Sequence, residues 1–253
     1  IFEGNTSETK TLVPILEAFQ NKFNIDKPIV VADATLLSQK NIEALSEKGY
    51  EYILGGRLRN ETEEIKKKII ELNVEEGKPK EVTTKNGRLI VSYLSKRAFV
   101  DKKNREKGLK RLEKKVVSGK LKKEHINNRG YNKYLKLTGE IGIAIDYEKF
   151  STDGIWDGLK GYVTNTNLTR EKVIANYSQL WNIEKAFRIS KTDLRIRPIY
   201  HRLKNRIEAH ICVCFAAYSV YKELERLLNI NKIELSPEKA INEIKEIRQL
   251  QYI

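Results

Sequence analysis

The sequence predicts an α/β fold, because its first 56 residues alternate amphipathic helices with short apolar strands. A helix is expected at 7–23, a strand at 29–33, a helix at 38–48 and a strand at 50–54. A strand that is apolar throughout is typical of a sheet buried on both faces. A strand, a helix and a strand in this order favour two parallel strands joined by a right-handed crossover.

Local signals support these elements. Ser38 is suited to cap the second helix and Gly49 to end it. The second strand runs directly into two glycines, Gly55 and Gly56. The first helix has apolar residues at helical spacing, namely Leu12, Ile15, Leu16 and Phe19.

Residues 57–150 differ in character and predict a β-rich insertion between two parts of one core. Asn86-Gly87, between β-rich flanks, is a strong hairpin signal. A charged helix is expected before it at 61–72, and two more strands are expected within 134–150.

The insertion contains a dense basic run at 102–123, which is expected to begin as a helix and to break at Gly119. Two interpretations of this run stay open. It either contacts DNA, in addition to the basic residues around Glu184 described below, or is a solvated helix face.

The last part of the sequence predicts a strand at 161–165, an amphipathic helix at 169–191 and, after a break at Pro198, a long helix at 202–228. A short amphipathic helix is expected in the tail. The predicted organisation has four parts: a first part of the core at 1–56, the insertion at 57–150, a second part of the core at 151–228 and a helical tail at 229–253.

The net charge is the clearest global indication of function. A formal charge of +14 over 253 residues favours a polyanionic partner, nucleic acid before membrane. The alternative is a Lys-rich proteome in which many proteins are basic. The longest apolar run, 211–220, is too short for a membrane span, which needs about 20 residues.

Both cysteines, Cys212 and Cys214, lie in that apolar run and are expected to be small buried residues. We do not expect a metal site with His210, because Cys212 would point away from the other two on one helix. These features and the polar N-terminus predict a cytoplasmic, nucleoid-associated protein. The chain starts at Ile1 and contains no methionine, so we expect it to be part of a longer protein.

Glu184 is the first candidate for chemistry. It falls on the apolar stripe of the 169–191 helix, where a side chain should face the interior. A buried carboxylate is costly unless it is paired, hydrogen-bonded or bound to metal. Because a heptad step returns almost to the same helix face, Tyr177, Glu184 and Lys191 are expected in one column.

Asp33 is the expected partner of Glu184. It ends a buried strand, and functional groups of α/β sheets gather beyond strand carboxyl ends. Two carboxylates in a basic protein suggest ligands of Mg²⁺ or Mn²⁺ for phosphodiester chemistry with two ions. The alternatives are a turn or cap role for Asp33 and an internal ion pair for Glu184.

Basic residues surround Glu184 in the sequence and are suited to neutralise DNA phosphates. Those assigned here to DNA binding are Lys185, Arg188, Lys191, Arg197 and His201. Trp181 and Tyr200 could stack on an unpaired base, although core packing is the more common role of such a tryptophan.

These residues form a recognisable pattern. The sequence resembles the DDE transposases of bacterial insertion sequences, in the group with the signature Tyr-x2-Arg-x3-Glu-x6-Lys. Tyr177, Glu184 and Lys191 have the spacing of this signature, and Leu180 replaces its arginine. Further similar stretches are Phe2-Glu-Gly-Asn-Thr-Ser-Glu, Val31-Ala-Asp-Ala, Tyr50-Glu-Tyr-Ile-Leu-Gly-Gly-Arg, Asp153-Gly, Leu180-Trp-Asn-Ile-Glu-Lys-Ala-Phe-Arg and Arg197-Pro-Ile-Tyr-His.

The resemblance implies an RNase H-like fold, a mixed sheet flanked by helices and interrupted by a β-rich insertion. It implies that Asp33 and Glu184 are the second and third catalytic acids and that Tyr177 and Lys191 contact DNA near the cleaved end. It also implies two Mg²⁺ ions, cleavage of transposon ends, strand transfer into target DNA, and a homodimer on paired ends.

The first acid of the family would lie upstream of Phe2, so we expect an N-terminally truncated core without its leading strands. The fragment alone is then expected to be inactive. Two alternatives are a non-catalytic DNA-binding remnant of a decayed element and an RNase H-like nuclease acting on RNA.

Overall fold

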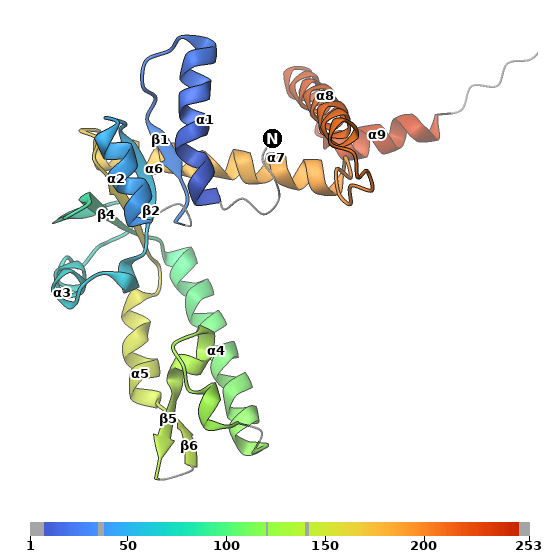
Figure 1. The fold of residues 1–253 in the computed structure, drawn as a ribbon. Helices are drawn as coiled ribbons and strands as arrows, with labels where there is room; N and C mark the ends of the chain where they lie inside the picture. Colours follow the sequence, from blue (N-terminus) through green and yellow to red (C-terminus); the bar gives the residue numbers. More distant parts are fainter. Residues whose placement is uncertain (1–7, 35–37, 120, 140–141, 248–253) are drawn as a thin grey trace, which may run out of the picture. The chain divides into compact units, whose positions relative to one another are not determined.

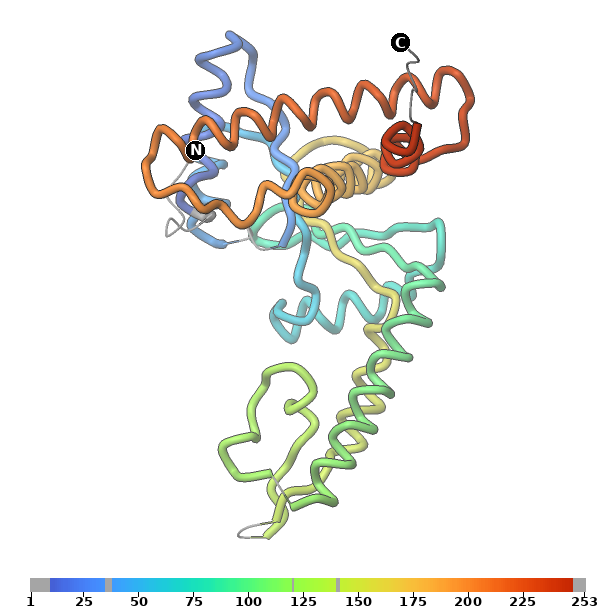
Figure 2. The backbone as a smooth tube through the Cα atoms, turned by 90° about the vertical axis from the view of Figure 1, so that its right-hand side faces the viewer, coloured from blue at the N-terminus to red at the C-terminus, as the bar shows by residue number. Residues whose placement is uncertain are grey.

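The computed structural model describes residues 8–34, 38–119, 121–139 and 142–247 (Figures 1 and 2). The chain divides into two compact units, one ending at Ser178 and the other running from Gln179 onward. We call them the sheet unit and the helical unit, and we describe each by itself.

A five-stranded mixed sheet organises the sheet unit. In spatial order its strands are β1 (Val30–Ala32), β2 (Tyr52–Gly56), β7 (Leu159–Thr164), β4 (Gly87–Tyr93) and β3 (Lys80–Thr84). β1 and β2 are parallel, with Ala32 opposite Leu54, as the sequence predicts. The remaining neighbours are antiparallel.

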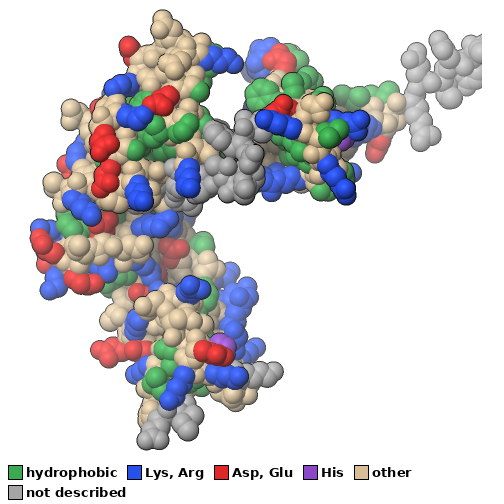
Figure 3. All heavy atoms as spheres, viewed as in Figure 1, with side chains coloured by type: hydrophobic (Ala, Val, Ile, Leu, Met, Phe, Trp, Pro, Cys, Tyr) green, Lys and Arg blue, Asp and Glu red, His purple; other side chains and the backbone are tan. Residues whose placement is uncertain are grey.

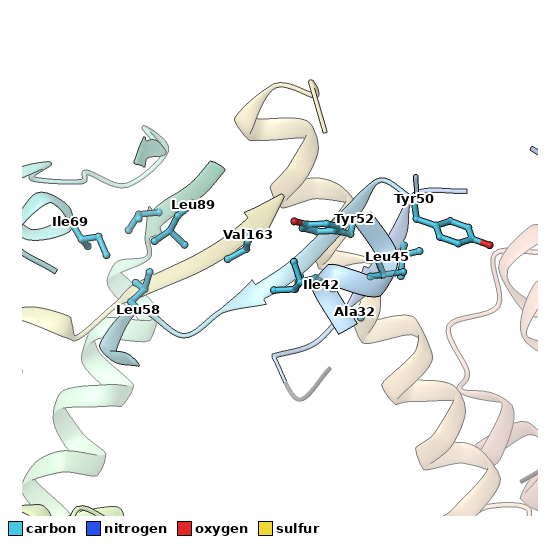
Figure 4. Close-up of a cluster of buried hydrophobic side chains, with 12 residues drawn as sticks. Ala32, Ile42, Leu45, Tyr50, Tyr52, Leu58, Ile69, Leu89 and Val163 are labelled. Carbon is cyan, nitrogen blue, oxygen red and sulfur yellow. The ribbon is translucent and has the colours of Figure 1, made fainter. Parts of the chain in front are cut away.

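Helices cover both faces of this sheet. Tyr52 and Leu54 of β2 point to one face, where they pack with residues of α1 (Glu8–Phe23), α2 (Gln39–Glu47) and α3 (Glu63–Glu71) (Figure 4). Ile53 points to the other face and packs against Val173 of α6 (Arg170–Ser178). This alternation follows from the two-residue period of a strand. The result is a mixed α/β fold of three layers, compatible with an RNase H-like domain.

The local signals in the sequence act as expected. The hydroxyl of Ser38 caps α2 by accepting from the backbone N–H of Asn41 at 3.2 Å. Gly87 begins β4 after the hairpin turn with a φ of +101°, and a Cβ there would lie 2.5 Å from the carbonyl oxygen of Thr164. Only glycine fits this turn and this close approach.

Residues 57–150, predicted to form an insertion, contribute to the main sheet and also form a second small core. β3 and β4 belong to the main sheet, because β4 pairs with β7. The residues after them form a second small core around Leu112, Tyr134 and Ile145. Its elements are α4 (Ser95–Val117), the short 3₁₀ helix η3 (Gly130–Tyr134), β5 (Leu135–Thr138), β6 (Gly142–Ile145) and α5 (Tyr147–Thr152).

The helical unit consists of α7 (Leu180–Thr192), α8 (Lys204–Ile230) and α9 (Pro237–Glu246). The single helix predicted at 169–191 is therefore wrong in one respect, since it is divided at Gln179 into α6 and α7. Tyr221 of α8 donates a hydrogen bond to Asp193 after α7 at 3.3 Å, and burial raises the pKa of this phenol to about 12.

The two cysteines of α8 differ in their burial. Cys214 is buried as predicted, but Cys212 is exposed, as are Val213 and Phe215 of the same apolar run. Within the described ranges, no helix is both long enough and apolar enough to cross a membrane.

Candidate active site

The carboxyl end of the parallel pair β1–β2 holds the first candidate residue. Asp33 follows β1 directly and is exposed. Because parallel strands end at the same edge, the residues that follow β2 lie nearby. Arg57, the first of them, donates a hydrogen bond from Nη2 to the carbonyl oxygen of Ala34 at 2.6 Å. A guanidinium group therefore lies beside the loop that presents Asp33.

Tyr177 reaches the same edge from the face of the sheet that is opposite to α1, α2 and α3. It lies on α6, and its ring packs edge-on against Tyr162 of β7 with the ring centroids 5.0 Å apart. A Cβ added to Gly55 would lie 2.5 Å from the phenol oxygen of Tyr177 and 2.9 Å from the backbone nitrogen of Ala34. The tyrosine hydroxyl therefore lies beside the residue that follows Asp33, and the absence of a side chain at Gly55 makes room for it.

Lys160 adds a second positive charge to this region. Its ammonium nitrogen lies 4.6 Å from the ring centroid of Tyr177 and 5.4 Å from that of Tyr162. Cation–π contacts of this kind hold the lysine ammonium group in place beside the two rings. Lys160 and Arg57 are the two residues of this region that the sequence did not predict as site residues. Arg57 ends one of the stretches that resemble the family, whereas nothing local distinguishes Lys160.

A pocket of about 280 Å³ adjoins this edge and is strongly basic. Arg57, Arg59, Arg97 and Lys160 line it, and none of the described residues that line it carries a carboxylate. Arg59 and Arg97 have acidic partners outside the lining, whereas Arg57 has no ion pair among the described residues. The lining is completed by Gly56, Leu58, Asn60, Trp156, Leu159 and Gly161.

Asp153, part of the Asp-Gly stretch that resembles the family, stabilises the fold around this pocket. Its Oδ2 accepts hydrogen bonds from Arg59 at 2.7 Å and from the Tyr134 hydroxyl at 2.6 Å, and it also accepts one from Lys133. Burial pushes the pKa of the Asp153 carboxyl upward, but the hydrogen bonds and the charges of Arg59 and Lys133 outweigh burial and hold it below its ordinary value. This aspartate joins the small core to the segment after β2.

Glu184 lies on α7 in the helical unit and is exposed. The expectation that it faces the interior is therefore wrong. Only Ile189 of α7 is buried, and Trp181 and Phe187 are 56% and 60% exposed. Periodicity shows which residues share a helix face but not whether another element covers that face. Within the described part of the chain, the Glu184 carboxylate has no ion pair or hydrogen bond, so the internal ion pair considered as its alternative role is not formed.

The basic residues predicted around Glu184 fall into two groups. Lys185 is ion-paired with Glu225 of α8, which also binds Lys222. One carboxylate shared by two ammonium groups neutralises one of their two charges, so Lys185 is partly neutralised. Those that remain exposed are Arg188, Lys191, Arg197 and His201, with Lys191 lying 5.5 Å from the ring centroid of Phe187 and His201 packing on His210.

The structure thus brings Tyr177 to the edge that carries Asp33, within the sheet unit. Glu184 and Lys191 lie in the helical unit, so the predicted column of three residues extends over both units. Across the described residues, no three His, Cys, Asp or Glu side chains are grouped so that they could hold a metal ion. The chemistry of the two exposed carboxylates nevertheless suits hard cations such as Mg²⁺.

Comparison with protein families identifies the class. The sequence model of a family described as the transposase DDE domain matches residues 1–220. Comparison with the curated proteins and with the solved structures gave no match. A basic α/β protein with exposed carboxylates at a sheet edge and on a helix fits an enzyme that acts on DNA.

Because the match covers most of its length, the chain belongs to the DDE transposase family. This confirms the predicted family, whereas the insertion-sequence group with its signature stays a prediction. Members of this family act on DNA and generally use divalent metal ions.

Proposed function

We propose that this chain carries two of the catalytic carboxylates with which an insertion-sequence transposase cleaves transposon ends and joins them to target DNA. In this proposal Asp33 and Glu184 are metal ligands, and the metal is Mg²⁺ or Mn²⁺, bound as two ions in the complete site. The observation that supports it most is the edge after β1, where Arg57 and the Tyr177 hydroxyl lie beside the backbone of Ala34, the residue next to Asp33.

The charges at this edge explain how a phosphate could bind next to a carboxylate. Asp33 and a DNA phosphate are both anions and repel each other unless cations lie between or beside them. Arg57 offers a planar fork suited to two phosphate oxygens, and Lys160 offers a point charge. The Tyr177 hydroxyl can donate a hydrogen bond to a phosphate oxygen or to the attacking water.

A divalent ion bound by the carboxylates would lower the pKa of a water ligand and would stabilise charge on the leaving oxygen. The protein side chains would position the scissile phosphate in line with that water. Such positioning contributes because it replaces a chance encounter by a fixed geometry.

The helical unit would supply the remaining contacts. Arg188, Lys191, Arg197 and His201 are exposed and would bind phosphates near the cleaved end. The ion-paired Lys185 would contribute less. We further propose that the protein works as a homodimer on paired ends, in the nucleoid of the cytoplasm.

A cleavage assay tests this proposal. The complete reading frame and its Asp33→Asn and Glu184→Gln variants would be incubated with Mg²⁺ and DNA that carries the element's own ends. Each variant should lose at least a hundredfold in cleavage rate, roughly 3 kcal/mol of activation free energy. The matched control is Glu208→Gln, since Glu208 is an exposed carboxylate on α8 of the same unit as Glu184.

Undiminished cleavage by the Asp33 or Glu184 variant would refute the assignment. DNA binding measured without metal should be the same in all four proteins, so that a loss of cleavage cannot be attributed to lost binding.

A further inference from the structure

The helix α4 presents a column of lysines that the proposed catalytic site does not use. Taking about 100° of rotation per residue, Lys96, Lys103, Lys107, Lys110 and Lys114 fall within a sector of roughly 60°. All five are exposed. Figure 3 shows Lys and Arg side chains gathered along this element. We call these five residues the lysine column.

The opposite side of α4 is the side that packs. Leu112 is 3% exposed in the small core, and Leu109 and Val116 pack against the same cluster. Arg105, also on this side, donates to the carbonyl oxygen of Phe150 at 2.9 Å and to Asp157 at 2.6 Å. The packing therefore fixes the rotation of α4 and directs the lysine column away from its own core.

The acidic residues of α4 do not neutralise the column. Asp101 pairs with Arg97 and accepts from the backbone N–H of Gly158, and Glu113 accepts from the Tyr147 hydroxyl. Glu106 borders the column but pairs with none of its lysines. In the part of the chain that the structure describes, no lysine of the column has an ion pair.

The exposed face of α3 differs from the lysine column, because lysines there are paired with glutamates. On α3, Lys66 pairs with Glu63 and Lys68 with Glu64, which is the usual mixture of signs on an exposed face. Five unpaired like charges along one line repel one another and cost stability. A polyanion lying along the line would remove this repulsion.

The length of the lysine column suits duplex DNA as the polyanion. The column extends over about 27 Å, at about 1.5 Å per residue. Duplex DNA presents one negative charge for about every 1.7 Å of its axis, so several phosphates can face the column at once. We propose that the lysine column of α4 binds the phosphate backbone of duplex DNA without reading its sequence. This proposal rests on the proposed function for the identity of the ligand, but it does not depend on Asp33 or Glu184.

The test measures how DNA affinity depends on salt, in EDTA so that metal-dependent cleavage plays no part. The variant replaces Lys103, Lys107 and Lys110 by Gln. Its control replaces Lys66, Lys68 and Lys78 by Gln, which removes the same net charge from lysines that are each paired with a glutamate. Thermal melts would check that both variants stay folded.

Each phosphate contact contributes about 0.9 to the slope of log affinity against log salt. The column variant should therefore have a slope smaller by about 2 to 3, and its affinity at about 0.1 M salt should fall at least tenfold. The control should keep the slope of the parent protein. An unchanged slope in the column variant, or an equal loss in the control, would overturn the proposal. Failure of the cleavage assay would leave this result unaffected, so the two proposals can fail separately.

Discussion

At the scale of single residues, the candidate site is defined by polar groups that the fold constrains. Gly55 has no side chain, and the hydroxyl of Tyr177 occupies the space beside it. Asp153 accepts three hydrogen bonds and is largely buried. Like Asp33 and Glu184, it lies in a stretch of sequence that is similar to the family. A largely buried carboxylate with three hydrogen bonds stabilises the fold, and it differs from Asp33 and Glu184 in that these two are exposed.

The pKa shift of Asp153 leads to a prediction about stability. Its folded-state pKa lies below the ordinary value of 3.8. The corresponding stability is therefore fully present above pH 3.8 and is lost as the pH falls through the folded-state pKa. We expect Asp153→Asn to lower the free energy of unfolding by about 1–3 kcal/mol at pH 7, because Arg59 and Lys133 lose their charged partner.

Urea unfolding of both proteins between pH 7 and pH 3 checks this prediction. The difference between them should shrink as the pH falls below about 4, because the carboxylate of the unfolded chain takes up its proton there before that of the folded chain. A difference that is independent of pH would show that the hydrogen-bond geometry, and not the charge, is responsible.

At the scale of elements, α6 is the helix that connects the sheet to the proposed chemistry. Val173 is fully buried on the sheet, and Tyr177, one turn later, reaches the end of β1 and β2. Residues four apart lie on the same face of a helix, so the packing of Val173 also aims Tyr177. A small displacement of α6 would move the hydroxyl away from the loop of Asp33.

Gly55→Ala tests this coupling. The new methyl group would lie 2.5 Å from the Tyr177 oxygen and would force α6 or the tyrosine to move. We expect a loss of about 1–3 kcal/mol in the free energy of unfolding. Adding Tyr177→Phe removes the closest contact and should restore part of that loss, although the close approach to Ala34 remains.

A double-mutant cycle by thermal or urea unfolding measures the coupling between positions 55 and 177. Strictly additive effects of the two substitutions would contradict the contact. Tyr177→Phe alone serves as the control, since it keeps the ring packed against Tyr162.

The elements also show which parts of the structure the sequence could predict. Ser38 and Asn86-Gly87 encode a cap and a hairpin in a few adjacent residues, so these elements were predicted nearly to the residue. The pairing of β4 with β7 joins Leu89 to Val163, far away in the chain, and no local pattern reports it. The position of Asp33 at the end of a strand was predicted because strand ends are readable, whereas only tertiary packing places Lys160 beside Tyr177.

At the scale of the whole molecule, the two units differ in how much core they contain. The sheet unit buries two clusters of side chains on the two faces of its sheet, and every member of both clusters lies before Ser178. In the helical unit, the large apolar side chains buried among the described residues are Ile189, Tyr221 and Leu228. A small core gives little stability to a chain of this size.

We therefore expect residues 1–178 to fold without the remainder. Their thermal unfolding, followed by circular dichroism, should stay cooperative with a midpoint within a few degrees of that of the whole chain. Residues 179–253 expressed alone should unfold without a cooperative transition, since less than about 5 kcal/mol is expected from a core of this kind. A cooperative melt of the second fragment would contradict this division of stability.

The contrast between the two cysteines has a practical consequence. Because Cys212 is exposed and Cys214 is buried, and the sequence contains no others, a maleimide dye should attach at one position on α8. The attached fluorophore would belong to the unit that carries Glu184. Changes in its emission on addition of DNA would then follow this unit alone, in real time and without any engineered labelling site.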